Sequence, residues 1–274
     1  MSWLLAPLLT GLATTVGALP FLWWSVSRRF YDTLLGLGAG LMLAAATLGL
    51  LATALADLHP GGHLDVARLG LVLGGFIAGV ALLWTMDRVI PHVHAGGHHV
   101  HVHDDHVHAH GAHDDNEVDN PERARRQGLL VVGVMSLHRL PEGFAIGAAY
   151  AAGGPSQLGL TLAIAIAVQN AVEGAVMAAP LKRGGLGKLR LLLLVSATGM
   201  AVPLAAIAGW ALSLRVAGAL PPMLALGAGA LLYLTCNEVI PESHSHGNEK
   251  RATFGVVGGF LIIILMQVLF GQSH

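Results

Sequence analysis

Apolar residues in this chain gather in runs that are long enough to cross a lipid bilayer. A membrane-spanning helix needs about 17–25 predominantly apolar residues, and polar or charged segments separate the runs that reach this length. The pattern therefore predicts an all-α integral membrane protein with eight transmembrane helices. The predicted spans are residues 4–24, 34–56, 69–86, 128–151, 157–180, 190–213, 219–240 and 252–270.

The composition supports this prediction and narrows the classes of function. Of the 274 residues, 54% are hydrophobic and only 11% are charged, unlike an ordinary soluble domain. The formal net charge of −1 comes with no basic, aromatic-rich surface, so nucleic acid is not an expected partner. The single cysteine, Cys236, excludes an internal disulfide framework. We expect one transmembrane domain, residues 1–274, surrounded by the lipid bilayer.

The positions of Lys and Arg predict how the chain is oriented. Most of these residues follow the first, third, fifth and seventh runs, whereas the opposite side holds only Arg68 and Arg215. Because cytoplasmic loops carry the excess of positive charge, we expect both termini outside the cytosol and the segment 92–126 inside it. A cell membrane, and specifically a bacterial inner membrane, is the expected location.

The fourth run carries three ionisable residues, His138, Arg139 and Glu142. A charge at membrane depth costs about 2.5–3.5 kcal/mol on insertion scales, so three together require a partner, a ligand or a water-filled cavity. His138 and Glu142 are four residues apart and share one helix face. Pro141 has no N–H to donate, so we expect the helix to bend or open beside this pair.

The fifth run repeats the arrangement, with Gln169 four residues before Glu173 and a glycine after each glutamate. Two facing helices would bring these two side chains and the pair of the fourth run to a common point. Imidazole, carboxylate and amide oxygen together suit a borderline divalent metal such as zinc.

Other candidate ligands lie in and just after the second and seventh runs. On sequence alone Met42, in the second run, is best read as a thioether that fills a gap in the core. Glu238 lies deeper in the seventh run than the residues after it, and is the better candidate for metal contact. For Glu242, His244 and His246 a solvated helix end and a metal exit station remain equal alternatives.

A histidine-rich segment joins the third and fourth runs. Its histidines are interspersed with aspartates, a composition typical of disordered segments that attract metal ions. We expect it to capture or sense metal transiently. Its ten histidines are His92, His94, His98, His99, His101, His103, His106, His108, His110 and His113.

Taken together, these features resemble the ZIP family of divalent metal transporters over nearly the whole chain. The specific evidence is H-x-x-P-E-G from His138, followed by Q-N-x-x-E-G from Gln169 in the next run. The resemblance implies inverted three-helix repeats around a central helix pair, transport of Zn²⁺ as substrate toward the cytosol, and elevator-like sliding of the helices that hold the metal. It also raises Met42 to a metal ligand beside the four motif residues, and it places Asp87, Glu238 and His244 near the release route.

This sequence also departs from the family pattern. Many members hold a second metal with an Asn after the histidine of span four, an Asp or Asn after the span-five Gln or His, and a Glu before the proline of span six. Here those positions are Arg139, Asn170 and Val202. An arginine is always charged and can bridge carboxylates, so we hypothesise that Arg139 replaces the second metal.

Two other classes of function stay open at this stage. One is an intramembrane zinc hydrolase, although H-E-x-x-H is absent and no surplus carboxylate is available as a general base. The other is a metal sensor or buffer that works through the histidine-rich segment. The sequence does not choose among zinc, cadmium, iron, manganese and cobalt. The oligomeric state is also open, with a homodimer among the alternatives.

Overall fold

The computed structural model describes residues 2–24, 27–56, 58, 63–89, 121–153, 157–216 and 218–270, and these residues are helical apart from short turns. The helices form eight rods, so the predicted all-α architecture is confirmed. In chain order the rods are η1 (Ser2–Leu4), α1 (Leu5–Ala18) and η2 (Leu19–Leu22); α2 (Arg28–Ala44), η3 (Ala45–Leu51) and α3 (Ala52–Leu55); α4 (Val66–Val89); α5 (Pro121–Gly153); α6 (Gln157–Arg183); α7 (Lys188–Gly199) and α8 (Ala201–Arg215); α9 (Leu220–Leu234), η6 (Thr235–Val239) and α10 (Ile240–His244); and α11 (Glu249–Phe270).

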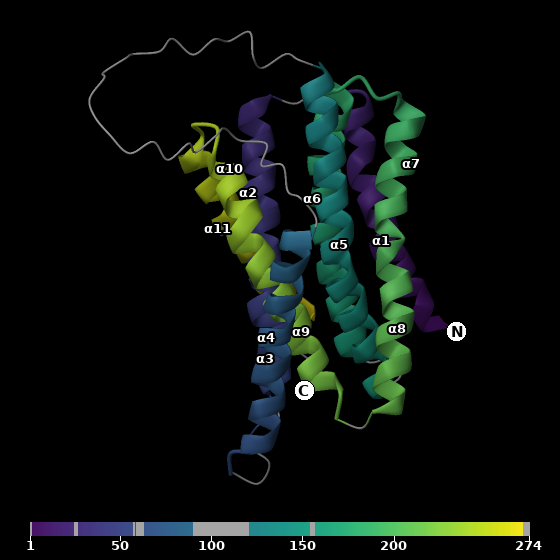
Figure 1. Cartoon of the computed structure of the whole chain (residues 1–274), viewed down its shortest axis with the longest axis vertical. Helices are drawn as coiled ribbons and strands as arrows, with labels where there is room; N and C mark the ends of the chain where they lie inside the picture. Colours follow the sequence, from purple (N-terminus) through teal and green to yellow (C-terminus); the bar gives the residue numbers. More distant parts are fainter. Residues whose placement is uncertain are drawn as a thin grey trace, which may run out of the picture.

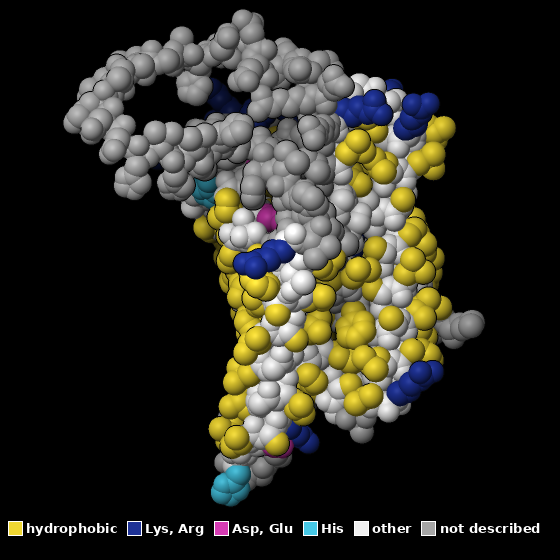
Figure 2. All heavy atoms as spheres, in the orientation of Figure 1, with side chains coloured by type: hydrophobic (Ala, Val, Ile, Leu, Met, Phe, Trp, Pro, Cys, Tyr) yellow, Lys and Arg dark blue, Asp and Glu magenta, His cyan; other side chains and the backbone are white. Residues whose placement is uncertain are grey.

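Within the described residues, seven of the rods are long and apolar enough to cross a membrane, and α5 is the exception. Its 33 residues include the three ionisable residues of the fourth run. In the space-filling view hydrophobic side chains cover much of the side of the bundle, while Lys and Arg lie toward its ends (Figure 2). This distribution is what a surrounding bilayer requires.

Two prolines have different effects on their helices. The helix at Pro141 was expected to bend or open; α5 runs unbroken through this proline, so it does not open there. The sixth span, predicted as one helix, is instead divided at Met200 into α7 and α8. Pro203 explains this division, since it has no N–H to donate to the carbonyl of Gly199 four residues earlier.

The rods associate in two halves, which lie on opposite sides of the bundle (Figure 1). α1, α5, α6, α7 and α8 form one half, whereas α2, α4, α9 and α11 form the other. The most extensive contacts are α5 with α8 and α1 with α6 in the first half, and α2 with α11 and α4 with α9 in the second. We call these the site half and the outer half.

The same pairing reveals an internal repeat. The first three rods correspond in order to the last three, so α1 matches α8, α2 matches α9 and α4 matches α11, while the central helices α5 and α6 match each other. This correspondence relates the pair α2–α11 to the pair α9–α4. It also relates the pair α1–α6 to the pair α8–α5. Each of these pairs is among the extensive contacts. Since each of the first three rods lies five positions before its counterpart in the chain, with four rods between them, the two cross the bilayer in opposite directions. The matched rods α2 and α9 also each contain a π-helical segment, η3 and η6, a feature frequent at functional sites.

Glycines allow the backbones within each half to approach closely. A Cβ at Gly147 of α5 would overlap the carbonyl of Ala206 in α8, and one at Gly40 of α2 would overlap that of Val256 in α11. Between the halves the packing is ordinary. A Cβ at Gly38 would lie 3.7 Å from a side-chain carbon of Val172 in α6. The close backbone contacts therefore join pairs of helices within each half, whereas the glycine contacts between the halves are ordinary.

Gly147→Ala is expected to destabilise the protein by about 1–3 kcal/mol, because the added methyl group overpacks the contact of α5 with α8. Gly133→Ala, in the same helix, is the matched control, since a Cβ there meets nothing within 4 Å. Unfolding of both variants in mixed micelles measures the difference. Equal stability of the two variants would contradict this close packing.

Candidate metal site

The two sequence motifs meet where α5 packs against α6, in the site half. Arg139, Glu142, Gln169 and Asn170 are fully buried, and Glu173 is only 2% exposed. The side chain of His138 lies outside the described residues. The two motifs were predicted to meet at one point. Every polar side chain of these motifs that the structure describes is buried there.

A single amide links the two carboxylates of the site. Nε2 of Gln169 donates to Oε1 of Glu142 at 2.5 Å and to Oε1 of Glu173 at 2.9 Å. The other end of the amide, Oε1 of Gln169, has no hydrogen-bond partner among the described residues. Two acidic side chains thus face one point from neighbouring helices, with an amide donor between them.

Arg139 lies beside this group and is held on three sides. Nη2 forms an ion pair with Oε2 of Glu173 at 3.2 Å. Nη1 donates to the hydroxyl of Thr14 in α1 at 2.7 Å and to that of Thr198 in α7 at 3.2 Å. The alternative that Arg139 points away from the site is therefore excluded. The observed ion pair involves one carboxylate, and Gln169 makes the bridge between the two.

The remaining predicted site residues take varied positions. Asn170 donates through Nδ2 to the carbonyl of Thr10 at 3.2 Å and is thereby tied to α1. Met42 is fully buried in a hydrophobic cluster that includes Ile146 of α5 and Ile166 of α6. The described residues contain no group of three or more His, Cys, Asp or Glu side chains placed to hold a metal ion. Because the side chain of His138 is not described, the full ligand set stays a prediction.

The candidate release residues lie at the end of the bundle where α10 meets α11. Glu238 is half-buried in η6. His244 is engaged within the protein, with Nδ1 2.9 Å from the carbonyl of Ile240 and Nε2 3.0 Å from the hydroxyl of Thr253. His246 lies between Asp32 of α2 and Glu242. The side chain of Asp87 and all ten histidines of the 92–113 segment lie outside the described residues.

Burial, and then the nearby Arg28 guanidinium, lower the pKa of His246. Glu242 and Asp32 oppose this shift with smaller effects. The lowered pKa favours the neutral imidazole, which is the state in which histidine binds metal ions.

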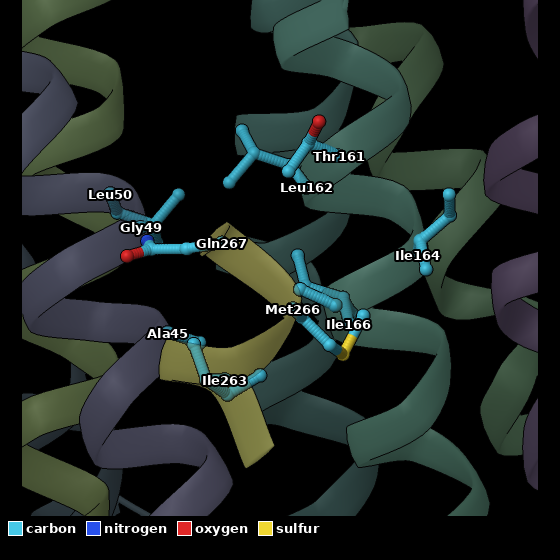
Figure 3. A pocket seen from close by; sticks show the side chains of 11 residues that line it. Ala45, Gly49, Leu50, Thr161, Leu162, Ile164, Ile166, Ile263, Met266 and Gln267 are labelled. Carbon is cyan, nitrogen blue, oxygen red and sulfur yellow. The ribbon is translucent and has the colours of Figure 1, made fainter. Parts of the chain in front are cut away.

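A small cavity lies away from this polar site, between the two halves (Figure 3). Ala45, Gly49 and Ile263 line it from the outer half, and Leu162 and Ile166 from α6. The cavity shows that the halves leave some space between them.

Eight rods around a buried charged site define a multi-pass membrane protein that handles a polar solute or ion within the bilayer. The family described as "ZIP Zinc transporter" matches residues 2–267. This chain belongs to the ZIP family. That family consists of transporters, so the hydrolase alternative is discarded.

Individual relatives match over similar lengths. Zinc transporter GufA of Myxococcus xanthus is 35% identical over 271 residues, which cover 98% of each chain. Zinc transporter ZIPB of Bordetella bronchiseptica is 35% identical over 267 residues, covering 94% of this chain and 78% of the relative. Zinc transporter ZIP11 of Homo sapiens is 26% identical over 324 residues, covering 95% of this chain and 94% of the relative.

Proposed function

We propose that this protein transports Zn²⁺ across the membrane into the cytosol, and that cadmium, iron or manganese are further substrates. The observation that carries the proposal is the buried pair Glu142 and Glu173, which share one amide at membrane depth. Buried carboxylates are costly unless they bind a cation or another partner. The names of the three relatives favour zinc as the cation. The proposed ligands are His138, Glu142, Gln169, Glu173 and Met42.

Gln169 would change its role when the metal binds. Its Nε2 now donates to both carboxylates, whereas only Oε1 can bind a cation. Rotation of the amide would bring Oε1 to the point that Nε2 now occupies, between the two glutamates. Without metal the amide donor reduces repulsion between the carboxylates, and with metal its oxygen completes the site.

Arg139 would take the place of a second metal ion. Its guanidinium is fully buried and paired with Glu173, so it supplies a fixed positive charge beside the transport site. The hydroxyls of Thr14 and Thr198 hold it in the site half. The transporter would therefore carry one metal ion in each cycle.

Sliding of the site half past the outer half would move the metal across the membrane. The close backbone contacts lie within the halves, whereas Gly38 and Gly49 face side chains of α6 at ordinary distances of 3.7 Å and 3.6 Å. The cavity of Figure 3 lies along this same surface. Glu142, Gln169, Glu173 and Arg139 lie in the site half and would move together, whereas Met42 belongs to α2 of the outer half. This arrangement supports an elevator-like mechanism.

The histidine-rich segment would lie in the cytosol and capture released metal, with both termini on the other side of a bacterial inner membrane. The positive charges near Arg28, Arg183 and Arg251 support this orientation. A homodimer is compatible with the proposal, which requires no second copy.

Deleting residues 92–120 tests this proposal against the metal-buffer alternative. Because transport would depend on α5 and α6, we expect zinc uptake by proteoliposomes to remain within about twofold of that of the full-length protein, since a segment of this histidine-rich composition is expected only to capture metal transiently. Loss of both uptake and metal binding would instead identify the segment as the working part of a metal buffer.

A further inference from the structure

The guanidinium of Arg139 binds Glu173 through only one of its nitrogens. Nη2 pairs with Oε2 of this glutamate at 3.2 Å. Nη1 is turned instead toward two hydroxyls, those of Thr14 at 2.7 Å and Thr198 at 3.2 Å. The remaining donor, Nε, is buried and has no hydrogen-bond partner among the described residues. Pairs of arginine and carboxylate are frequently bidentate, with two parallel N–H groups on both oxygens, so this one-oxygen pairing needs an explanation.

The two oxygens of Glu173 have separate partners. Oε2 pairs with Arg139, whereas Oε1 accepts the hydrogen bond from Nε2 of Gln169 at 2.9 Å. In the proposed transport site the metal takes the position of this nitrogen, so it would bind Oε1. A bidentate arginine would cover Oε1 as well and would hold a fixed positive charge against the incoming cation. The one-oxygen pairing therefore keeps the arginine and the metal on different oxygens.

Close helix packing fixes the two hydroxyls beside Arg139. A Cβ at Gly174 of α6 would overlap the carbonyl of Thr14, and a Cβ at Gly11 of α1 would overlap that of Gly199 in α7. Thr14 is fully buried, and Thr198 at the end of α7 is 4% exposed. α1 is thus in backbone contact with both neighbouring helices at the level of the site, so the two hydroxyls cannot withdraw from the guanidinium.

The hydroxyl of Thr198 is oriented to accept a hydrogen bond. It donates to the carbonyl of Val195 at 2.7 Å, so its lone pairs are available to Nη1 of Arg139. A valine in place of either threonine would keep the shape of the side chain and offer no acceptor. Without both acceptors Nη1 would be a buried donor without a partner, which is costly.

We propose that Thr14 and Thr198 are positioning residues that keep Arg139 on one oxygen of Glu173 and so reserve the other oxygen for the transported ion. This inference rests on the proposed transport function, with Arg139 as the fixed charge of the site. Without the two acceptors the guanidinium would pivot until Nε and Nη2 both bind Glu173, because that arrangement also provides Nε with a partner. The arginine would then compete with the metal.

The double variant Thr14→Val with Thr198→Val tests this role in the full-length protein, through initial rates of Zn²⁺ uptake by proteoliposomes. Competition for one oxygen should raise the apparent KM about tenfold, the lower limit for groups that orient metal ligands, and leave the maximal rate near that of the wild type. Thr14→Ser with Thr198→Ser keeps both acceptors and should retain the wild-type KM. Thr15→Val is the matched control in α1, because the Thr15 hydroxyl lies 2.9 Å from that of Ser196 instead.

Zinc affinity of the purified protein, measured by competition with a chelator, separates this competition from a loss of structure. The two valines should weaken zinc binding about tenfold in the wild-type background. In an Arg139→Met background they should have no further effect, because no guanidinium remains to compete.

An equal loss of affinity in both backgrounds would show that the threonines have only a structural role, and would overturn the inference. A lower maximal rate at unchanged KM, or no change in either, would overturn it as well. These results would leave the transport function intact, since uptake by the wild type tests that function by itself. Absence of wild-type uptake would reject transport, and the binding comparison would still test the threonines.

Discussion

Replacing Arg139 by methionine is expected to lower the stability of the protein by about 3–5 kcal/mol, the usual cost of removing one partner of a buried ion pair. Methionine fills much of the same space without the charge, so the effect comes from Glu173, which is left buried without its cation. Zinc uptake should fall at least tenfold, since a neighbouring group of this kind typically changes metal affinity or activity by about 10–100-fold. Unfolding in mixed micelles and uptake by proteoliposomes measure the two effects.

The double variant Arg139→Met with Glu173→Gln separates stability from function. Replacing both members of a buried ion pair by neutral side chains is often close to neutral for stability. We therefore expect the double variant to recover most of the lost stability and none of the lost uptake, because Glu173 is also a proposed ligand. An Arg139→Met protein that transports zinc and cadmium with unchanged apparent affinity would contradict the substitution of arginine for a second metal.

Glu142→Gln is expected to have the largest effect on transport. The substitution keeps the shape of the side chain and removes the negative charge that attracts the cation. Gln169 would then face one carboxylate and one amide, and its nitrogen would lose the charge-assisted hydrogen bond at 2.5 Å. Loss of a partner that only orients a ligand already costs about 10–100-fold in metal affinity, and loss of a direct ligand should cost no less. Initial uptake rates over a range of zinc concentrations measure the change.

An exposed acidic residue gives the matched control for this prediction. Glu249, at the start of α11, is exposed. Glu249→Gln removes the same charge from the chain and should retain the uptake rate of the wild type. Equal losses in both variants would indicate a general effect of charge or expression, and would argue against Glu142 as a ligand.

The fold could be predicted well from the sequence because the bilayer imposes a simple length rule on apolar runs. The predicted span 190–213, for example, corresponds to α7 and α8, from Lys188 to Arg215. The break at Met200 was missed. A proline within an apolar run often leaves a helix continuous, as Pro141 does in α5. Which outcome occurs depends on neighbouring helices, whose contacts the sequence does not reveal.

The site could be predicted in part for a similar reason. Residues four apart share a helix face, so spacing placed Gln169 and Glu173 together on α6, and the repeated motif suggested that this face meets Glu142 of α5. The partners of Arg139 could not be found in this way, because Thr14 and Thr198 belong to distant rods and are common residue types.

The most direct test of the transport function is the initial rate of Zn²⁺ uptake into proteoliposomes that contain the wild-type protein, compared with Glu142→Gln and with protein-free liposomes. The proposed function predicts saturable uptake by the wild type, and uptake by Glu142→Gln close to that of empty liposomes. Uptake by the wild type that does not exceed the protein-free rate, while the purified protein still binds zinc, would contradict it and favour a metal sensor or buffer.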